Sequence, residues 1–144
     1  SRLMDERDLN GVMEQTIESI RIAEQIGDIR TIITIKSNVC RFMVEVYESI
    51  PPSFQPEIYK DAFRLADDAI LAAEKVGEFS SLMSSKLTKF YVLANFEKYD
   101  DAGTLFKEII VELKSSEIDE EAFWNENMRG FPFEIAIQLF GTKK

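Results

Sequence analysis

The chain has 144 residues, of which 45% are hydrophobic and 30% are charged, and its formal net charge is −9. This length and composition are typical of one folded domain and exclude an extensively disordered chain. The acidic balance argues against nucleic acid and membrane surfaces as partners, because both require a basic surface, and no apolar run approaches the ~20 residues of a membrane span.

Helical periodicity runs through most of the sequence. Isoleucine and alanine recur at three- and four-residue spacing before Gly27 and again before Gly77, which suits glycine at a helix C-terminus. Three prolines in the loop 49–56 interrupt this pattern, since no helix interior accommodates them. The predicted helices, in chain order, are 9–26, 29–48, 57–76, 79–96, 99–114, a short helix near 119–128 and a last helix from Pro132 to about 140.

The sequence also repeats itself. "AEQIGD" at 23–28 returns as "AEKVGE" at 73–78, and "YKDAFRLADDAI" from Tyr59 resembles "YDDAGTLFKEII" from Tyr99. The first offset is fifty residues and the second is forty, and the proline-rich loop accounts for the difference. A unit of about forty residues is the length of an α-helical hairpin repeat, which must stack on copies of itself to bury its apolar face.

These motifs resemble tetratricopeptide (TPR) repeats. The resemblance covers about 9–114 and rests on "YxDAxxL" at the start of a helix and on "AxxxGD/E" between two helices. Glu97 departs from the pattern, because it stands where the family places a turn glycine. The resemblance implies an all-α fold of about six to seven helices, with antiparallel hairpins stacked as a short right-handed α-solenoid; HEAT-like hairpins are the rival. We therefore predict one domain over 1–144, with repeats over 9–114 and capping helices over 117–144.

In such a stack the first helix of each pair lines the inner, concave surface, and here these helices are 29–48 and 79–96. Each carries polar side chains opposite its apolar face, and Glu45 is the one carboxylate among them. Small hydroxyls and amides beside arginine and tyrosine can bind a peptide backbone or a carboxylate. We define the polar strip as Arg30, Thr34, Asn38, Arg41, Ser84, Thr88, Tyr91 and Asn95, and we predict partner binding there. A merely solvated helix face is the alternative.

Other charged residues are interpreted structurally. Lys36 and Lys86 occupy equivalent positions within the apolar faces, and we expect their stems to follow the core while the ammonium groups reach water. Pairing with a carboxylate of a neighbouring helix is the alternative. Adjacent acids such as Asp67 and Asp68 point about 100° apart on a helix, so we interpret them as solvated charges and not as an acid–base pair.

Two features of the composition bear on catalysis and compartment. The chain has no histidine, which removes imidazole chemistry and the common zinc and di-iron ligand sets. Its single cysteine, Cys40, lies in an apolar segment, so we expect a buried side chain in a protein of the reducing cytoplasm. We expect no catalytic residue, no metal site and no cofactor.

The leading functional hypothesis is a non-catalytic module that binds a peptide or helix of a partner protein. Because the polar strip contains Arg30 and Arg41, we expect that this partner segment is anionic. Because the sequence starts at Ser1, we expect an engineered terminus or a piece of a larger protein or assembly. The alternatives are a small-ligand sensor or carboxylate-based enzyme that uses the polar strip, and a structural spacer. The aromatic segment "FPFEIAIQLF" at 131–140 is apolar nearly all round, and a homodimer through it is an alternative to its role as a cap.

Overall fold

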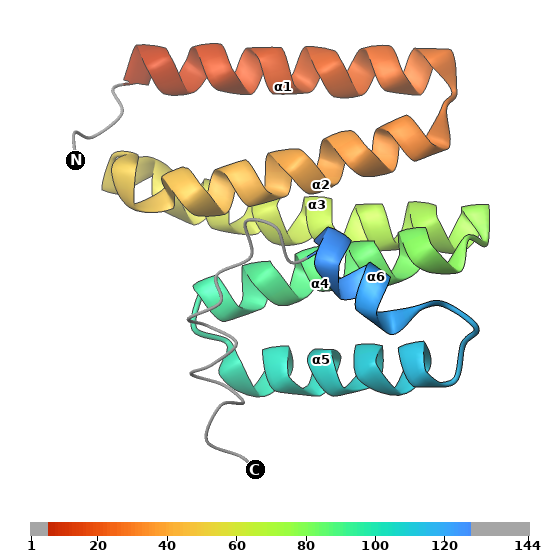
Figure 1. Cartoon of the computed structure of the whole chain (residues 1–144). Coiled ribbons are helices and arrows are strands. Elements are labelled where there is room, and N and C mark those ends of the chain that lie inside the picture. The colour runs from red at the N-terminus through yellow and green to blue at the C-terminus, as the bar shows by residue number, and fades with distance from the viewer. Residues whose placement is uncertain (1–5, 128–144) are drawn as a thin grey trace.

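The computed structural model describes residues 6–127, which form six α-helices packed in sequence as antiparallel neighbours (Figure 1). They are α1 (Glu6–Ile26), α2 (Ile29–Val46), α3 (Gln55–Val76), α4 (Phe79–Asn95), α5 (Tyr99–Lys114) and α6 (Glu120–Asn127). No strand occurs between residues 6 and 127. The all-α class and the first six predicted helices are confirmed. The predicted last helix from Pro132, with the proposed homodimer surface, lies outside the described residues.

The connection between α2 and α3 differs in detail from the prediction. Two short 3₁₀ helices, Tyr47–Ser49 and Pro52–Phe54, replace the expected plain loop. The helix α3 then begins at Gln55, two residues earlier than predicted. The prediction assigned Pro56 to the loop, whereas this proline lies in the first turn of the helix. A proline is accepted there since the first N–H groups of a helix have no intrahelical partner.

The repeated phrase marks two equivalent helix ends. Gly27 and Gly77 both adopt a left-handed backbone with φ of 75°, so each closes one helix before the next begins. Asp28 caps α2, since its carboxylate accepts hydrogen bonds from the backbone N–H and the hydroxyl of Thr31. Glu78 precedes α4 and accepts from the Ser81 hydroxyl at 3.0 Å. The acidic residue after each glycine therefore lies at a helix N-terminus, where negative charge is favourable, but only Asp28 caps a backbone N–H with its side chain.

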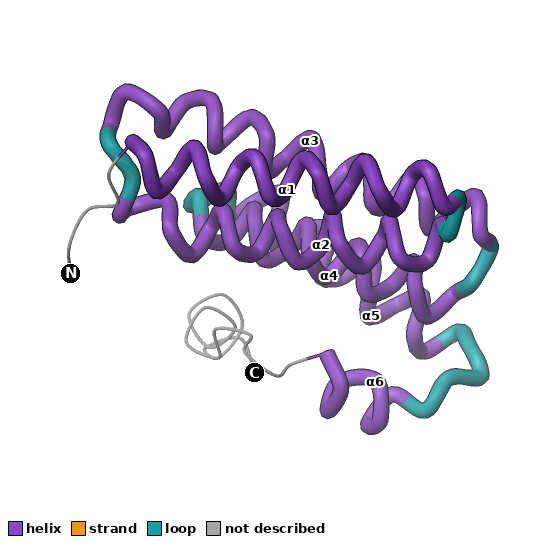
Figure 2. Tube along the Cα trace, turned by 90° about the horizontal axis from the view of Figure 1, so that it is seen from above, coloured by secondary structure: helices purple, strands orange, loops and turns teal. Residues whose placement is uncertain are grey.

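The core is centred on α4, which packs against α2, α3, α5 and α6. Figure 2 shows α1 to α5 running along a common direction. Met83, Leu87 and Phe90 of α4 are fully buried. Where α2 crosses α3, the Cys40 thiol donates a hydrogen bond to the backbone carbonyl oxygen of the buried Ala62 at 3.1 Å. Burial raises the pKa of the Cys40 thiol to about 12, so this residue is an inert core side chain, as predicted.

The equivalent lysines Lys36 and Lys86 have largely buried stems, as expected, but their ammonium groups follow the alternative interpretation and pair with carboxylates. Their side chains are only 16% and 14% exposed, and both ammonium groups pair with carboxylates of the following helix. Lys36 lies 3.7 Å from Asp68, while Lys86 lies 2.9 Å from Glu108 and 2.8 Å from Glu112. The stems lie along packed surface, and each ammonium group ends in an ion pair with a partly exposed carboxylate. Asp68 and Glu108 are themselves equivalent by the forty-residue offset, so the two pairs are copies of one contact.

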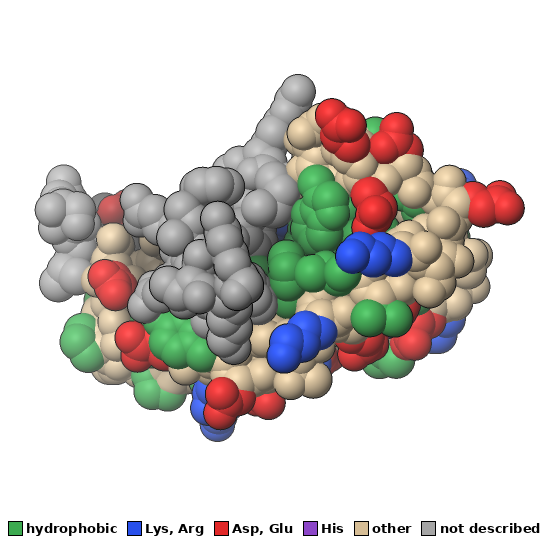
Figure 3. Space-filling model, turned by 60° about the horizontal axis from the view of Figure 1, so that its bottom comes forward, with side chains coloured by type: hydrophobic (Ala, Val, Ile, Leu, Met, Phe, Trp, Pro, Cys, Tyr) green, Lys and Arg blue, Asp and Glu red, His purple; other side chains and the backbone are tan. Residues whose placement is uncertain are grey.

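The surface is mixed in character. Figure 3 brings the α5 side of the molecule forward and shows hydrophobic side chains gathered together, with acidic and basic side chains around them. Among residues 6–127, no helix has the length and apolar character needed to cross a membrane.

Candidate functional site

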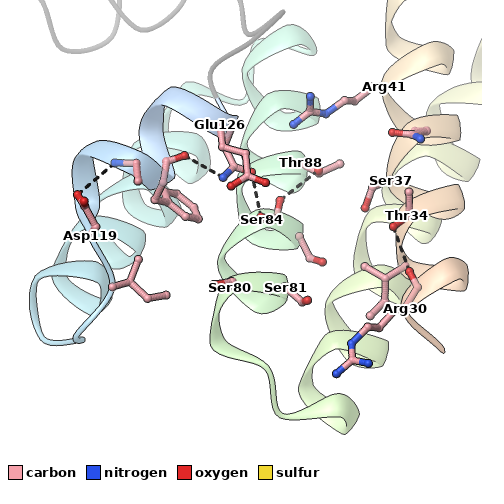
Figure 4. Close-up of a pocket in the computed structure, with 17 residues that line it drawn as sticks. Arg30, Thr34, Ser37, Arg41, Ser80, Ser81, Ser84, Thr88, Asp119 and Glu126 are labelled. Carbon is pink, nitrogen blue, oxygen red and sulfur yellow. Dashed lines mark hydrogen bonds between the residues drawn. The ribbon is translucent and has the colours of Figure 1, made fainter. Parts of the chain in front are cut away.

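A groove of about 740 Å³ runs between α2 and α6, and α4 forms its floor (Figure 4). Most of the lining residues are polar or charged, but polar and apolar atoms contribute about equally to the lining surface. The polar lining residues are Arg30, Thr34, Ser37, Asn38, Arg41, Ser80, Ser81, Ser84, Ser85, Thr88, Asp119, Glu126 and Asn127. The apolar lining residues are Ile33, Ile118, Ala122 and Phe123.

The groove contains most of the polar strip. The six residues of the strip that line it are Arg30, Thr34, Asn38, Arg41, Ser84 and Thr88. Tyr91 and Asn95 are not among the lining residues. Tyr91 is only 6% exposed because α4 has helices on several sides, so less of its surface is free than on α2. The Asn95 side-chain amide donates to the Tyr91 carbonyl oxygen at 2.8 Å and is thereby held against its own helix.

The α2 side of the groove supplies two arginines in different electrostatic states. Arg30 is hydrogen-bonded to Glu78, which lowers the pKa of that carboxyl group, so its charge is already compensated. Arg41 instead lies over the ring of Tyr91, with its guanidinium carbon 5.8 Å from the ring centre. Among the arginines whose side chains the structure describes, Arg21, Arg30 and Arg64 each pair with a carboxylate, whereas Arg41 does not.

Tyr91 acts as a support for this arginine. Its pKa is raised chiefly by burial and further by Glu45, so the phenol stays neutral at physiological pH. A guanidinium stacked on an aromatic ring keeps its N–H groups free at the edges for another acceptor. Arg41 therefore presents an oriented positive charge to the groove.

The α6 side of the groove was not foreseen from the sequence, which predicted only a cap over 117–144. Phe123 is 5% exposed and anchors α6 against the core, and Trp124 contacts Phe106 of α5 with ring centres 5.6 Å apart. A hydrogen bond of 2.9 Å from the Ser84 hydroxyl to the Asn127 side-chain oxygen fixes α6 to α4. Ile118, Phe123 and Trp124 pack against the core, and these large apolar side chains in a polar stretch are the sequence signal for the packed side of this segment.

The polar groups of the groove differ in their availability. Thr34 and Thr88 donate to the carbonyl oxygens of their own helices, at 3.1 and 3.2 Å. Ser37, Asn38 and Ser80 make no side-chain hydrogen bond with any described residue, and they can therefore bind an external donor or acceptor. The Ser85 hydroxyl is buried at the groove lining and has no hydrogen-bond partner among residues 6–127.

Two residue types that often carry chemistry lie away from the groove or are not clustered. No group of three or more potential metal ligands occurs within residues 6–127. The raised pKa of Cys40 keeps its thiol protonated, and it does not line the groove. The side chains that do line the groove can accept and donate hydrogen bonds and bind charged groups.

Comparisons with protein-family models, curated proteins and solved structures found no match to this chain. The class of protein is therefore defined by the fold itself: a small all-helical protein whose described helices pack in sequence as antiparallel neighbours.

Proposed function

We propose that this chain is a non-catalytic, TPR-like helical repeat module that binds a segment of a partner protein in the groove between α2 and α6. The repeat part of the proposal is supported by the duplicated phrase and by the equivalent pairs Lys36–Asp68 and Lys86–Glu108. It is also supported by the contact between α2 and α4, the two helices that the TPR resemblance assigns to the inner surface.

The observation that carries the binding proposal is Arg41. This arginine lines the groove, is supported by the Tyr91 ring and has no ion pair with a described residue. Nearby amides and hydroxyls such as Asn38 and Ser37 provide hydrogen bonds to a peptide backbone. An anionic group of the partner at Arg41 satisfies the free charge, and hydrogen bonds along the groove position the rest of the segment.

The lining of the groove suits an extended segment. From Arg30 to Arg41 the α2 side of the groove measures roughly 16 Å at 1.5 Å per helical residue, which an extended chain spans with about five residues. Ser37, Asn38 and Ser80 offer hydrogen-bonding groups to the groove. An extended segment has free backbone N–H and C=O groups to pair with them, whereas a helix uses these groups internally.

The experiment compares capture of partners by the full chain and by matched variants. Immobilised wild-type protein, Arg41→Ala and Arg64→Ala are incubated with the same cell extract, and the retained proteins are quantified by mass spectrometry. Arg64 is a suitable control because it is an exposed arginine of α3 outside the groove. We expect a protein that is retained by the wild type and by Arg64→Ala and is depleted on Arg41→Ala.

The binding segment is then defined with overlapping peptides and measured by fluorescence anisotropy. Affinity should be roughly micromolar, and Arg41→Ala should weaken it up to about fivefold, since an exposed charge contact contributes about 1 kcal/mol or less. A partner whose affinity for Arg41→Ala equals that for wild type, at low and at high salt, would place the binding surface elsewhere.

A further inference from the structure

The two sides of the groove carry opposite charges. On the α2 side Arg41 is the arginine without an ion pair, whereas the α6 side carries Asp119 and Glu126. Glu126 is exposed and makes no hydrogen bond or ion pair with any described residue. Figure 4 shows Glu126 and Arg41 toward the same end of the groove, on opposite sides of α4.

This arrangement has a consequence for the ligand, because a purely acidic segment would meet Arg41 on one side and like charge on the other. Repulsion from Glu126 would cancel much of what Arg41 contributes, since both are solvent-accessible charges of comparable strength. A segment with an acidic residue toward α2 and a basic residue toward α6 satisfies both sides. Successive side chains of an extended chain point in opposite directions. The positions of the two residues must therefore differ by an odd number, as in i and i+1 or i and i+3.

We propose that the groove selects an extended segment in which an acidic and a basic residue stand at odd spacing, the acid bound by Arg41 and the base by Glu126. This inference rests on the proposed function and specifies the partner's chemistry more closely. It also revises the expectation of a simply anionic peptide, because the sequence did not indicate that α6 would form the second side of the groove.

The experiment is a selection from a random dodecapeptide display library on the immobilised full chain. The same library is selected on Arg41→Gln, on Glu126→Gln and on Glu74→Gln, whose exposed carboxylate in α3 lies outside the groove. We expect the wild type and Glu74→Gln to enrich peptides with one acidic and one basic residue at odd spacing. Selection on Arg41→Gln should lose the preference for the acidic residue and keep that for the basic residue. Selection on Glu126→Gln should lose the preference for the basic residue and keep that for the acidic residue.

Affinities of the enriched peptides provide the quantitative readout. Each single variant should weaken the bipolar peptide roughly twofold to fivefold, the range of an exposed charge pair. Replacing the basic residue of the peptide by alanine should weaken its binding to the wild type. The same replacement should leave its affinity for Glu126→Gln unchanged. Circular dichroism melts of all variants, with Arg41→Lys as a charge-conserving variant, separate loss of binding from loss of fold.

The outcomes distinguish this inference from the proposed function. Enriched peptides that are acidic only, or that bind Glu126→Gln as tightly as wild type, overturn the bipolar selection and leave peptide binding at Arg41 intact. Enriched peptides whose affinity is indifferent to Arg41→Gln, or a selection that enriches nothing, overturn the proposed function together with this inference.

Discussion

The turn between α4 and α5 contains a strained residue whose replacement should stabilise the protein. Glu97 has a φ of 63°, the left-handed conformation that Gly27 and Gly77 adopt at two other helix ends. The turn itself is well formed, because the backbone N–H of Lys98 donates to the Leu93 carbonyl oxygen at 2.8 Å and that of Glu97 to the Ala94 carbonyl oxygen at 3.1 Å. These are the two hydrogen bonds of a Schellman motif, in which glycine is the usual residue at the position of Glu97.

The magnitude follows from two opposing terms. A left-handed backbone costs an L-residue roughly 1–2 kcal/mol, and Glu97→Gly removes this strain. Glycine in turn gives the unfolded chain more freedom, which costs about 0.4–1 kcal/mol. The net effect is a gain of about 0.5–1 kcal/mol in the free energy of unfolding, or roughly 2–4 °C in melting temperature for a domain of this size.

Urea denaturation followed by far-ultraviolet circular dichroism measures this difference. The midpoint should rise in Glu97→Gly while the slope stays constant, because the surface exposed on unfolding is unchanged. Glu97→Ala is the matched control: it removes the carboxylate but keeps the Cβ atom, so it should bring no gain. Gly77→Ala should lose about 1 kcal/mol by the reverse argument. The reasoning is refuted if Glu97→Gly and Glu97→Ala have the same stability.

Two further predictions concern the contacts between helices. Lys86→Met should cost up to about 1 kcal/mol, and more than Lys36→Met, because Lys86 contacts two carboxylates at short distance and Lys36 one at 3.7 Å. The hydrogen bond from Lys86 lowers the pKa of Glu108, so this contribution is complete above the ordinary glutamate pKa of 4.5 and is lost as the pH falls below it. The difference in urea midpoint between the wild type and Lys86→Met should therefore be smaller at acidic pH than at neutral pH. An equal difference at both pH values would contradict this. Ala102→Leu should cost roughly 1–3 kcal/mol, because Ala102 is fully buried and a larger side chain overpacks the junction. Thr104→Leu, at an exposed position of α5, is its control, and equal melting temperatures for the two variants would oppose the packing argument.

The helices could be predicted from the sequence because their signals are local. Isoleucine and alanine spacing, the glycines at 27 and 77, and the prolines of the loop each act within a few residues of where they stand. The same local information located the apolar face of α2 and hence the burial of Cys40. Helix boundaries near proline were less well predicted, since Pro56 is compatible both with a loop and with a first helical turn.

The site could be predicted only in part, because its missing residues depend on contacts between helices. A helical wheel describes one helix at a time, so it placed Tyr91 on an open surface that the neighbouring helices in fact cover. The position of α6 depends on Phe123 and Trp124 meeting surfaces of α4 and α5 that do not exist until the earlier helices have packed. For the same reason the lysine pairs were predicted only as an alternative, since Asp68 and Glu108 belong to other helices.

Comparing the two copies of the sequence repeat distinguishes residues that build the fold from residues that line the groove. Positions where the copies agree, such as Gly27 and Gly77 or Lys36 and Lys86, close helices or join them. The groove positions differ at the same fifty-residue offset: Arg30 and Ser80, Thr34 and Ser84, Asn38 and Thr88, Arg41 and Tyr91. At the last pair the difference is itself the interaction, because the arginine of one copy lies over the tyrosine of the other. Two identical copies would present either two repelling arginines or two neutral rings at this point, and neither would give one oriented positive charge. If the groove binds a partner as we propose, its selectivity arises at the positions where the two copies differ.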